Sequence, residues 1–446
     1  MKKKYDNSKN LVIRYSIKKK IQNKKIVIGV IGLGYVGIPL AILFSKKNFK
    51  VFGFDSNKEK IRTLRQKKSF LKNISNEDIK YIFKRGNCFD NFEKISECDV
   101  IIICVPTPLK NKNKPNLSYV RNAMKFIKKY LHENQLIILE STSYPGTTRE
   151  EIADKIGGKF RIGENFFVGF SSERINPGFN ENSIQLIPKV VSGYTKNCLE
   201  LVSLFYKSFF DKIIPCKTLE IAEFSKLLEN IYRAVNIGFI NEMKFIADKM
   251  SIDIFDVIKI ARTKTFGFRA FDPGPGIGGH CIPVDPHYLY WKSMKIGVKA
   301  NFIKLSAETN EKVIKFIINK IFLILKKLKK NPQDVKVLIL GVAYKRNIDD
   351  YRESSSLKLI DKLLERKFKT SKIKWHDPYI NDLKDGIITK NYPDKIKLNS
   401  SQLKNFDITI LMTDHDILDY DLIYKYSKLI IDCRGRFQVC QKVIRA

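Results

Sequence analysis

Short runs of apolar residues alternate with helical or polar stretches along the first half of the chain. The runs are continuous, as expected for strands of a parallel sheet that helices cover on both faces. They occupy residues 26–31, 51–54, 100–105, 136–140 and 166–170. This alternation predicts an open, doubly wound parallel sheet.

The pattern changes after about residue 215. Residues 219–250 and 307–330 have helical periodicity without a strand signal. Strand–helix alternation then resumes, with apolar runs at 335–342, 373–375, 408–412 and 429–431. We therefore predict an α/β protein in which two Rossmann-like, doubly wound domains are joined by a long central helical segment.

This organisation divides the chain into four parts. We predict a basic, poorly ordered extension (1–23), an N-terminal domain (24–215), a central helical domain (216–330) and a C-terminal domain (331–446). No apolar run approaches the roughly 18 residues that a membrane span needs. The basic start is followed by polar residues and not by the apolar core of an export signal. We therefore expect a cytoplasmic protein with no membrane partner.

The chain carries a formal net charge of +36. A charge of this size suggests a polyanionic partner, but the lysines are spread along the whole chain and no nucleic-acid-binding motif occurs. We therefore expect a solvated basic surface and no specific nucleic-acid partner. The eight cysteines are scattered without a Cys-x-x-Cys pair, which argues against a disulfide framework and against a zinc or other metal site.

A glycine motif, Gly32-Leu33-Gly34-Tyr35-Val36-Gly37, directly follows the first predicted strand. Its three glycines suit a tight turn, a close approach of backbone to a pyrophosphate, and packing of helix on strand. Asp55 ends the second predicted strand, where a carboxylate binds ribose hydroxyls. Because a carboxylate there would repel a 2′-phosphate, the sequence predicts binding of NAD and not of NADP.

Two further predicted strands end at the edge of the sheet where the glycine motif and Asp55 are expected to bind the cofactor. Their ends are Cys104-Val105-Pro106-Thr107-Pro108 and Glu140-Ser141-Thr142. In an open α/β sheet, ligands bind outside the carboxyl ends of the strands. We expect Pro106, Thr107, Ser141 and Thr142 to contribute to the cofactor site.

The long central helix carries one polar stripe on an otherwise apolar surface. Its members are Glu223, Lys226, Asn230 and Arg233, spaced by three or four residues. The pattern fits either a stripe that lines a site or a solvated face, and the helix pattern alone does not decide between them.

A glycine-rich segment, residues 271–286, surrounds Cys281. It resembles neither helix nor strand. We interpret its glycines as making a flexible loop whose backbone can lie against a ligand, and not as residues required by close packing. His280 precedes the cysteine and Asp285 follows it by four residues. A partly exposed cysteine near Lys226 would have its thiolate favoured, which makes Cys281 a candidate nucleophile.

Taken together, these motifs resemble the UDP-glucose/GDP-mannose dehydrogenase family over about residues 25–440. The resemblance rests on the glycine motif, the cysteine segment and a series of shorter motifs in family order. These are residues 105–108, Ser141-Thr142, 145–148, Ser172-Glu173-Arg174, 223–230, 341–345 and 350–354.

The resemblance implies an NAD-dependent, four-electron oxidation of a sugar CH2OH to a carboxylate. Cys281 would capture the aldehyde as a thiohemiacetal, and the resulting thioester would be hydrolysed. Lys226 and Asn230 would stabilise the oxyanion on O6. Glu173 and Asp285 would move protons and activate water, and Thr142 would position it.

The resemblance also implies binding roles. The cofactor residues would be Gly32, Gly34, Tyr35, Val36, Gly37, Asp55, Pro106, Thr107, Ser141, Thr142 and Arg352. The UDP-sugar residues would be Glu173, Arg174, Lys226, Asn230, Arg262, Gly278, Gly279 and Lys345. The central helices would build a homodimer or a higher homo-oligomer, in which a neighbouring subunit supplies Arg262.

The cysteine segment separates branches of the family. His280 before the cysteine and Pro283-Val284-Asp285 after it resemble the branch that oxidises UDP-N-acetylglucosamine for surface-polysaccharide or O-antigen synthesis. UDP-glucose enzymes usually have a lysine where Val284 stands. The alternative substrates are UDP-glucose, UDP-N-acetylmannosamine and UDP-N-acetylgalactosamine. A catalytically inactive NAD-binding scaffold is the alternative from another class.

Overall fold

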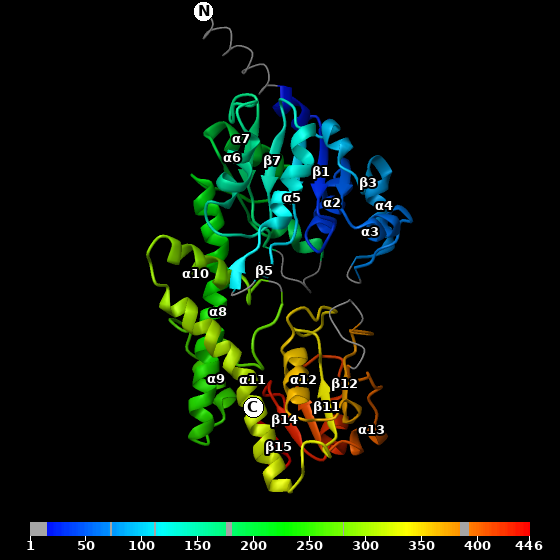
Figure 1. Ribbon diagram of the computed structural model, residues 1–446, viewed down its shortest axis with the longest axis vertical. Coiled ribbons are helices and arrows are strands. Elements are labelled where there is room, and N and C mark those ends of the chain that lie inside the picture. The colour runs from blue at the N-terminus through cyan, green and yellow to red at the C-terminus, as the bar shows by residue number, and fades with distance from the viewer. Residues whose placement is uncertain (1–15, 72–73, 111–112, 175–180, 280, 384–391) are drawn as a thin grey trace, which may run out of the picture. The chain divides into compact units, whose positions relative to one another are not determined.

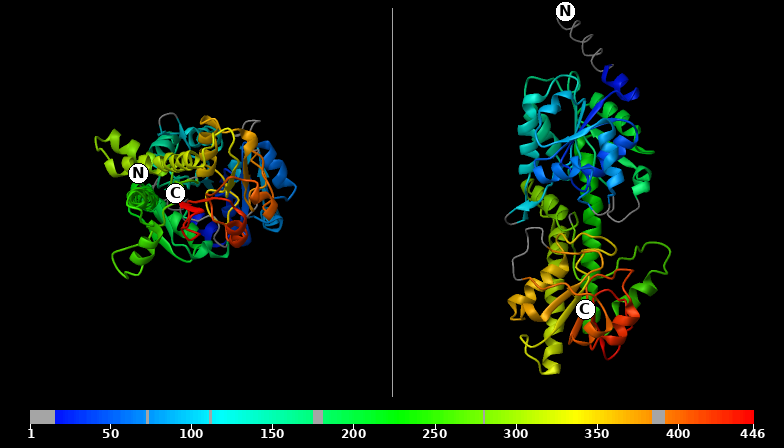
Figure 2. Two further views of the ribbon diagram at one scale, coloured as in Figure 1. Left: turned by 90° about the horizontal axis from the view of Figure 1, so that it is seen from below. Right: turned by 90° about the vertical axis from the view of Figure 1, so that its right-hand side faces the viewer.

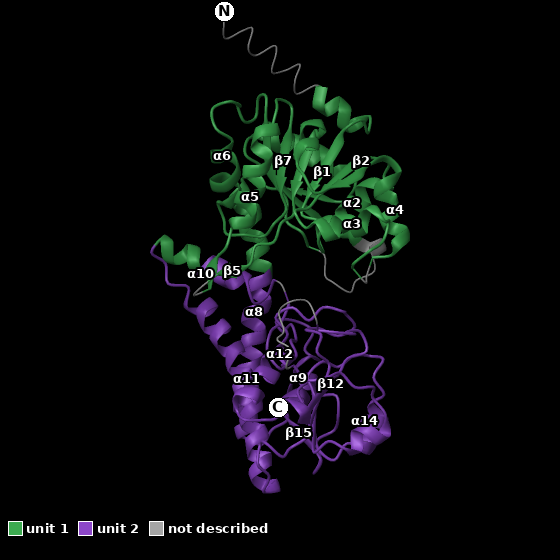
Figure 3. Ribbon diagram, turned by 45° about the vertical axis from the view of Figure 1, so that its right-hand side comes forward, with its two compact units in different colours: residues 1–229, 291–296 green, residues 230–290, 297–446 purple. Residues whose placement is uncertain are grey.

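The computed structural model describes residues 16–71, 74–110, 113–174, 181–279, 281–383 and 392–446. It divides into two compact units, which we call unit 1 (residues 1–229 and 291–296) and unit 2 (230–290 and 297–446) (Figure 3). This division differs from the predicted separate central domain. The boundary falls inside α8 (Leu219–Lys249), because this one 31-residue helix contributes residues to both units.

Unit 1 contains an eight-stranded sheet in the order β10-β9-β8-β7-β4-β1-β2-β3 (Figure 1). The strands are β1 (Val27–Ile31), β2 (Lys50–Phe54), β3 (Asn87–Phe89), β4 (Val100–Ile103), β7 (Leu136–Leu139), β8 (Phe167–Phe170), β9 (Lys189–Gly193) and β10 (Ile213–Pro215). Neighbouring strands are parallel except β8 and β9, which are antiparallel. A separate two-stranded ribbon joins β5 (Leu109–Lys110) to β6 (Lys114–Pro115). The five strands expected from the apolar runs are confirmed, whereas β3, β9 and β10 were not predicted.

Helices cover both faces of this sheet (Figure 2). Val100 and Ile102 belong to one apolar core, which includes side chains of α2 and α7, whereas Ile101 and Ile103 belong to a second core beneath α5. Because successive strand residues point to opposite faces, a continuous apolar run fills both cores. The helices of unit 1 are α2 (Gly37–Lys46), α3 (Lys58–Arg65), α4 (Asn76–Arg85), α5 (Ser118–Ile127), α6 (Asp154–Ile156) and α7 (Lys196–Lys207).

The described part of the N-terminal extension is ordered, contrary to the prediction. Residues 16–22 are helical, and Ile17 and Ile21 are each 1% exposed in the same core as α2. The two isoleucines are four residues apart and therefore share one helix face. Lys20 adds an ion pair to Asp99, with 2.7 Å between Nζ and Oδ1. Two apolar residues at helical spacing are thus enough to dock a segment that is otherwise basic.

Unit 2 contains a five-stranded, all-parallel sheet in the order β12-β11-β13-β14-β15. The strands are β11 (Val337–Leu340), β12 (Ile373–His376), β13 (Ile408–Leu411), β14 (Ile430–Asp432) and β15 (Val443–Arg445). The helices are α9 (Ile254–Ala261), α10 (Asp285–Lys295), α11 (Asn301–Leu328), α12 (Ser355–Glu365), α13 (Ser400–Lys404) and α14 (Tyr420–Tyr426), and α10 also reaches into unit 1. The second doubly wound domain is confirmed, with β15 added at the edge of its sheet. Within the described ranges no helix is long and apolar enough to cross a bilayer.

Candidate functional site

The glycine turn after β1 has the geometry of a dinucleotide-binding turn. Gly32 has φ +92°, and a Cβ there would lie 2.8 Å from the carbonyl oxygen of Cys104. A Cβ on Gly37 would lie 2.0 Å from the carbonyl oxygen of Gly32, whereas one on Gly34 would meet no atom within 4 Å. Two of the glycines are therefore required by packing, and Gly34 leaves open backbone where a pyrophosphate can approach.

Asp55 lies beside this turn, at the end of β2. Its Oδ2 accepts a hydrogen bond from Leu33 N at 3.0 Å, and its Oδ1 accepts one from Asn57 N at 2.9 Å. The backbone of the turn thereby holds the carboxylate at the carboxyl edge of the sheet, where ribose hydroxyls bind. The residues present fit NAD.

The loops after β4 and β7 are tied to each other. Thr107 donates from Oγ1 to the carbonyl oxygen of Thr142 at 2.7 Å, and Ser141 donates from Oγ to that of Val105 at 2.7 Å. Pro106 is exposed between them. The structure thus brings the two predicted strand ends together in unit 1.

Glu173 and Arg174 follow β8. Glu173 Oε1 accepts from Arg174 N at 2.6 Å, and its side chain is 15% exposed. The guanidinium of Arg174 pairs with Glu229 and donates to Pro188 O at 3.0 Å. Arg174 therefore ties the residues that directly follow β8 to Pro188 and to α8.

A buried charged cluster, which no sequence pattern predicted, lies next to Glu173. Lys189 Nζ lies 2.8 Å from Glu140 Oε2 and 3.8 Å from Glu173 Oε2, and Tyr206 donates from its hydroxyl to Glu140. Burial raises the pKa of Glu140 to about 7, although Lys189 acts in the opposite direction. The one available signal was a lysine at the start of an apolar run, which is uncommon unless the lysine is paired.

Glu223, the first residue of the polar stripe, binds backbone. Its carboxylate accepts from Gly146 N at 2.5 Å, from Thr148 N at 2.8 Å and from Thr148 Oγ1 at 2.7 Å. Burial raises the pKa of Glu223 to about 7, against these hydrogen bonds. We conclude that Glu223 holds the 145–148 turn in place.

The next two members of the stripe are Lys226 (7% exposed) and Asn230 (0% exposed), one turn apart on α8. Asn230 donates from Nδ2 to Asp285 Oδ2 at 2.5 Å and accepts from Arg233, which is itself exposed. Three of the four stripe residues are therefore buried, which excludes the solvated-face interpretation for them.

Cys281 lies at the end of an irregular segment, in the turn that leads into α10 (Asp285–Lys295). Its carbonyl oxygen accepts from Val284 N at 3.0 Å and from Asp285 N at 2.8 Å, and α10 begins at Asp285. The missed signal was Asp285-Pro286, because an acidic residue and a proline are both favoured in the first turn of a helix. The partial positive charge of a helix N-terminus favours a thiolate, and Cys281 is half-buried.

The glycines before Cys281 are packing residues, contrary to the prediction of a flexible loop. A Cβ on Gly278 would lie 2.7 Å from Tyr344 Cβ, and one on Gly279, at φ +91°, would lie 2.7 Å from Tyr344 Cε2. Gly279 N also donates to Arg352 O at 3.0 Å. The segment is thus fitted against the 344–353 loop of unit 2. His280 lies outside the described residues.

The remaining predicted residues of unit 2 lie in two places. Lys345 belongs to the loop that packs on the glycines, and burial, then Arg233, lowers its pKa. Arg352 forms an ion pair with Asp350, with 2.5 Å between Nη2 and Oδ2. Arg262 directly follows α9 and pairs with Asp272 at 2.7 Å, with both side chains more than half exposed.

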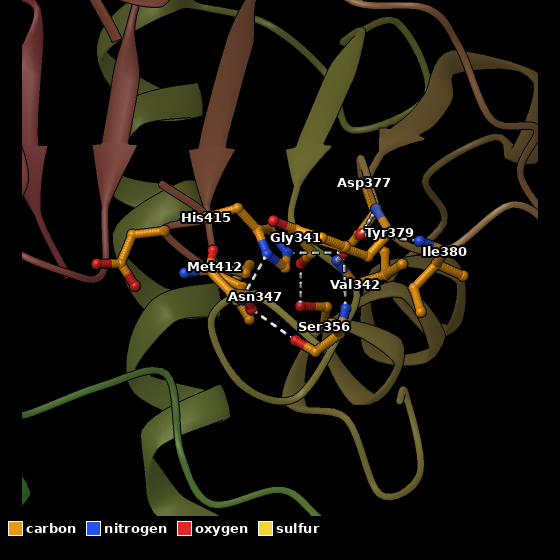
Figure 4. A network of polar contacts seen from close by, with 12 residues as sticks. Gly341, Val342, Asn347, Ser356, Asp377, Tyr379, Ile380, Met412 and His415 are labelled. Carbon is orange, nitrogen blue, oxygen red and sulfur yellow. Dashed lines mark hydrogen bonds and ion pairs between the residues drawn. The ribbon is translucent and has the colours of Figure 1, made fainter. Parts of the chain in front are cut away.

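The turn after β11 has the same features as the turn after β1, a glycine with positive φ beside a carboxylate at the end of the neighbouring strand (Figure 4). Gly341 has φ +83°, and Asp377, at the end of β12, accepts from Val342 N at 2.8 Å and from Ala343 N at 2.9 Å. His415 Nδ1 accepts from Asn347 N at 3.0 Å, so the ring is neutral there and donates from Nε2 to Asp377 Oδ2 at 3.0 Å. Unit 2 therefore has its own ordered glycine turn beside a carboxylate.

Comparison with known proteins assigns this arrangement to a family. Three family profiles match in order: the NAD binding domain (residues 24–210), the central domain (220–312) and the UDP binding domain (338–439) of the UDP-glucose/GDP-mannose dehydrogenase family.

Curated relatives and a solved structure agree with this match. The chain is 34% identical to Protein CapL of Staphylococcus aureus (92% of this chain, 95% of the relative) and 35% identical to a UDP-N-acetyl-D-glucosamine 6-dehydrogenase of Pseudomonas aeruginosa (77% and 81%). It is 34% identical to a UDP-N-acetyl-D-mannosamine dehydrogenase of Methanocaldococcus jannaschii (87% and 85%). The structure of UDP-D-ManNAc dehydrogenase from Pyrococcus horikoshii superposes with a TM-score of 0.82 at 28% identity (94% and 98%). The chain therefore belongs to the UDP-glucose/GDP-mannose dehydrogenase family and is an NAD-dependent nucleotide-sugar dehydrogenase.

Proposed function

We propose that the protein oxidises UDP-N-acetyl-D-glucosamine at C6 to UDP-N-acetyl-D-glucosaminuronate. The observation that carries the chemical part is Cys281 in the turn before α10, with Asp285 four residues on and hydrogen-bonded to Asn230. The choice of sugar rests on the residues around Cys281 and on relatives that carry this name in Pseudomonas aeruginosa and Salmonella typhi.

The reaction needs two oxidations of one carbon and one hydrolysis. NAD supplies the acceptor for the hydride that leaves C6 in each oxidation. Between the oxidations the Cys281 thiolate adds to the C6 aldehyde and forms a C–S bond. The second oxidation turns this thiohemiacetal into a thioester. Hydrolysis then breaks the C–S bond, the acid is released and Cys281 leaves as a thiolate.

Lys226 and Asn230 stabilise negative charge on the C6 oxygen. Lys226 carries an ammonium group on a buried helix face, and the Asn230 side chain is held by Asp285 and Arg233. An amide donor that is already held needs no reorganisation as charge develops, which is the condition for effective oxyanion stabilisation, and the Lys226 cation adds to it. They act in both oxidations, because each passes through an oxyanion.

Glu173 and Asp285 move the protons, and Thr142 positions the water. Glu173 accepts a proton from water as the water oxygen attacks the thioester carbonyl, which requires Glu173 as a carboxylate. Asp285 lies at the first turn of α10 and keeps the Asn230 amide oriented.

The cofactor and the sugar nucleotide use the two glycine turns and their neighbours. Gly32, Gly34, Tyr35, Val36, Gly37, Asp55, Pro106, Thr107, Ser141 and Thr142 bind NAD, and Arg352 contributes to the same ligand. Gly278, Gly279, Lys345, Arg174 and Arg262 bind the UDP-sugar. Lys345 suits a phosphate because burial leaves its ammonium poorly solvated, so an anion stabilises it.

We further propose a homodimer or a higher homo-oligomer. One face of α8 and α9 exposes large apolar side chains, among them Tyr232 (45% exposed), Phe239 (54%), Ile246 (50%) and Ile260 (72%). Exposed apolar rows at helical spacing mark a surface that a partner covers. A second copy of the chain is the partner that we propose, and it would supply Arg262.

UDP-N-acetyl-D-mannosamine is the second candidate substrate, because relatives at similar identity carry that name. The two sugars differ only in the configuration at C2. The test is NADH formation with UDP-N-acetylglucosamine, UDP-N-acetylmannosamine, UDP-N-acetylgalactosamine and UDP-glucose at equal concentration. The proposal expects the highest kcat/KM with UDP-N-acetylglucosamine, and a higher value with its C2 epimer would replace it.

A further inference from the structure

Before the chain reaches Cys281 it passes through a buried Pro-Gly-Pro stretch, residues 273–275. A proline has no backbone N–H, so the N–H of Gly274 is the only one in these three residues. A buried N–H and a buried carbonyl oxygen both need a hydrogen-bond partner. Both partners come from side chains of α8. Gly274 N donates to Asn241 Oδ1 at 3.1 Å, and Lys244 Nζ donates to Gly274 O at 3.1 Å.

The Asn241 side chain is held in the orientation that this contact requires. It is fully buried, and its Nδ2 donates to Asn310 Oδ1 on α11 at 2.9 Å. The Asn310 amide donates in turn to the carbonyl oxygens of Ser306, at 2.9 Å, and Ala234, at 3.3 Å. Since these carbonyl oxygens only accept, the Asn310 oxygen faces Asn241, and the Asn241 oxygen faces Gly274. Two helices therefore fix the acceptor for the Gly274 N–H.

Lys244 is a costly residue in this position. It is 4% exposed, and burial lowers its pKa to about 8, although Cys433 acts in the opposite direction. Besides its bond to Gly274 O, its ammonium group lies over the ring of Phe316, 5.3 Å from the centroid. An apolar side chain of the same length would fill the space without burying a charge. The hydrogen bond to Gly274 is what the lysine adds.

The charged groups around Lys244 are already paired or positive. Asp248, one turn further along α8, is paired with Lys320 of α11. Arg434, whose Nη1 would lie 2.9 Å from a Cβ on Gly274, disfavours a second positive charge beside it. The described contacts of the ammonium group are therefore a carbonyl oxygen of the cysteine segment (residues 271–286) and an aromatic ring.

The helix α8 thereby holds the cysteine segment at both ends. The upstream end is bound through Gly274, and the downstream end is bound through Asp285 by Asn230. Lys244 and Asn230 are about four turns apart on this helix, roughly 21 Å along its axis. Cys281 lies on the chain between these two anchors, so its position depends on both.

We infer that Lys244 is a positioning residue for Cys281. With Asn241, it fixes the upstream end of the cysteine segment at Gly274. The inference deepens the proposed function and rests on Cys281 as the nucleophile. A segment released at this end keeps the Asn230 anchor, so Cys281 stays in the site but is placed less precisely. A displacement of about 1 Å is enough to lower a rate by about 10²-fold.

The test compares Lys244→Met with Lys320→Met in the full-length enzyme. Lys320 is the matched control, because it lies over the same Phe316 ring but pairs with Asp248. With NAD and the best substrate of the panel, Lys244→Met should lower kcat by about 10- to 100-fold and leave KM for NAD within about twofold, since the cofactor turn belongs to unit 1. Its urea midpoint should equal or exceed that of the wild type, because a buried charge is removed. The control should keep the wild-type kcat within about twofold.

A second readout does not depend on activity. Because residues 273–275 contain one backbone N–H, hydrogen exchange measured in a peptide that spans them reports on Gly274 directly. In the wild type this N–H should exchange at least about tenfold more slowly than an unprotected amide. It should exchange several times faster in Lys244→Met, and as in the wild type in Lys320→Met. Asn241→Leu, which removes the acceptor of the same N–H, should lose both protection and kcat.

Three results would overturn the inference. They are a kcat for Lys244→Met equal to that of the control, a lowered urea midpoint with a normal kcat, and an unprotected Gly274 N–H in the wild type. If Lys244→Met does not fold, the wild-type exchange rate and the kcat of Asn241→Leu decide. A wild type that is inactive on every sugar contradicts the proposed function itself, and hydrogen exchange then still decides whether α8 anchors Gly274.

Discussion

Asn230 donates a hydrogen bond from its side-chain amide to the carboxylate of Asp285, with 2.5 Å between Nδ2 and Oδ2. The same amide accepts from Arg233 through its oxygen, so both ends of the group are held. Asp285 begins α10, and its own N–H is bonded to the carbonyl oxygen of Cys281. Asn230 therefore fixes the first turn of the helix that follows the proposed nucleophile.

Replacing Asn230 by Leu should impair both stability and chemistry. The loss of a buried donor to a carboxylate costs about 1–3 kcal/mol of unfolding free energy. The loss of an oxyanion donor lowers kcat by about 10² to 10³. Asn236→Ala on the same helix is the matched control, because that amide donates to the carbonyl oxygen of Tyr232 near the surface and holds no catalytic group. Equal kcat values for Asn230→Leu and the control would contradict the assignment.

Because of Asp55, we expect the enzyme to prefer NAD strongly over NADP. Its carboxylate is held beside Leu33 N, where the 2′-phosphate of NADP would meet a like charge. We expect kcat/KM to be at least about tenfold higher with NAD than with NADP, since one unfavourable contact of about 1.4 kcal/mol has that effect. Asp55→Asn should narrow the difference. Comparable kcat/KM values for the two cofactors in the wild type would show that Asp55 does not bind the ribose.

The apolar face of α8 predicts self-association. Phe239→Glu places a charge in the middle of this face and should shift the mass measured by light scattering at micromolar concentration towards that of a monomer. Tyr119→Glu on α5 is the control, because Tyr119 is also exposed (48%) but belongs to a different helix, in unit 1. A wild type that is monomeric and fully active would exclude the dimer.

Asp377 should stabilise the protein in a pH-dependent manner. Burial opposes its ionisation, but the hydrogen bonds from His415 and from backbone N–H groups such as that of Ala343 outweigh it and lower its pKa. A carboxyl group whose pKa is lowered by folding contributes stability above its unfolded pKa of about 3.9, and this stability is lost as pH falls through the folded value.

The matching variant is Asp377→Asn, which leaves some of these donors facing an amide NH2 group. It should lower the free energy of unfolding at pH 7 by about 1–3 kcal/mol and reduce the loss of stability on acidification. Urea unfolding between pH 3 and pH 7 measures both effects. The exposed Asp334→Asn serves as the control, and an equal acid dependence in Asp377→Asn and the wild type would contradict the account.

The sequence predicted the features that depend on residues close to one another in the chain. Asp55 could be assigned because it lies 18 residues after Gly37 in one strand–helix–strand unit, and α8 because its periodicity is long and regular. Lys189 could not be assigned, because its partners are 16 and 49 residues away and its position depends on the reversed direction of β9. The sequence left open whether Glu223 lines a site or a solvated face, and in the structure its carboxylate accepts hydrogen bonds from a turn about 75 residues away. Periodicity shows which face of a helix or strand is polar, but it does not show which groups the polar side chains of that face will contact.

The measurement that tests the central claim most directly is the yield of NADH for each molecule of UDP-sugar consumed, with the product identified by mass. The account predicts two NADH per sugar and a uronic acid with no free aldehyde, and almost no turnover in Cys281→Ser, whose hydroxyl is far less ionised than a thiol. One NADH per sugar with release of an aldehyde, or a normal yield of uronic acid from Cys281→Ser, would contradict it.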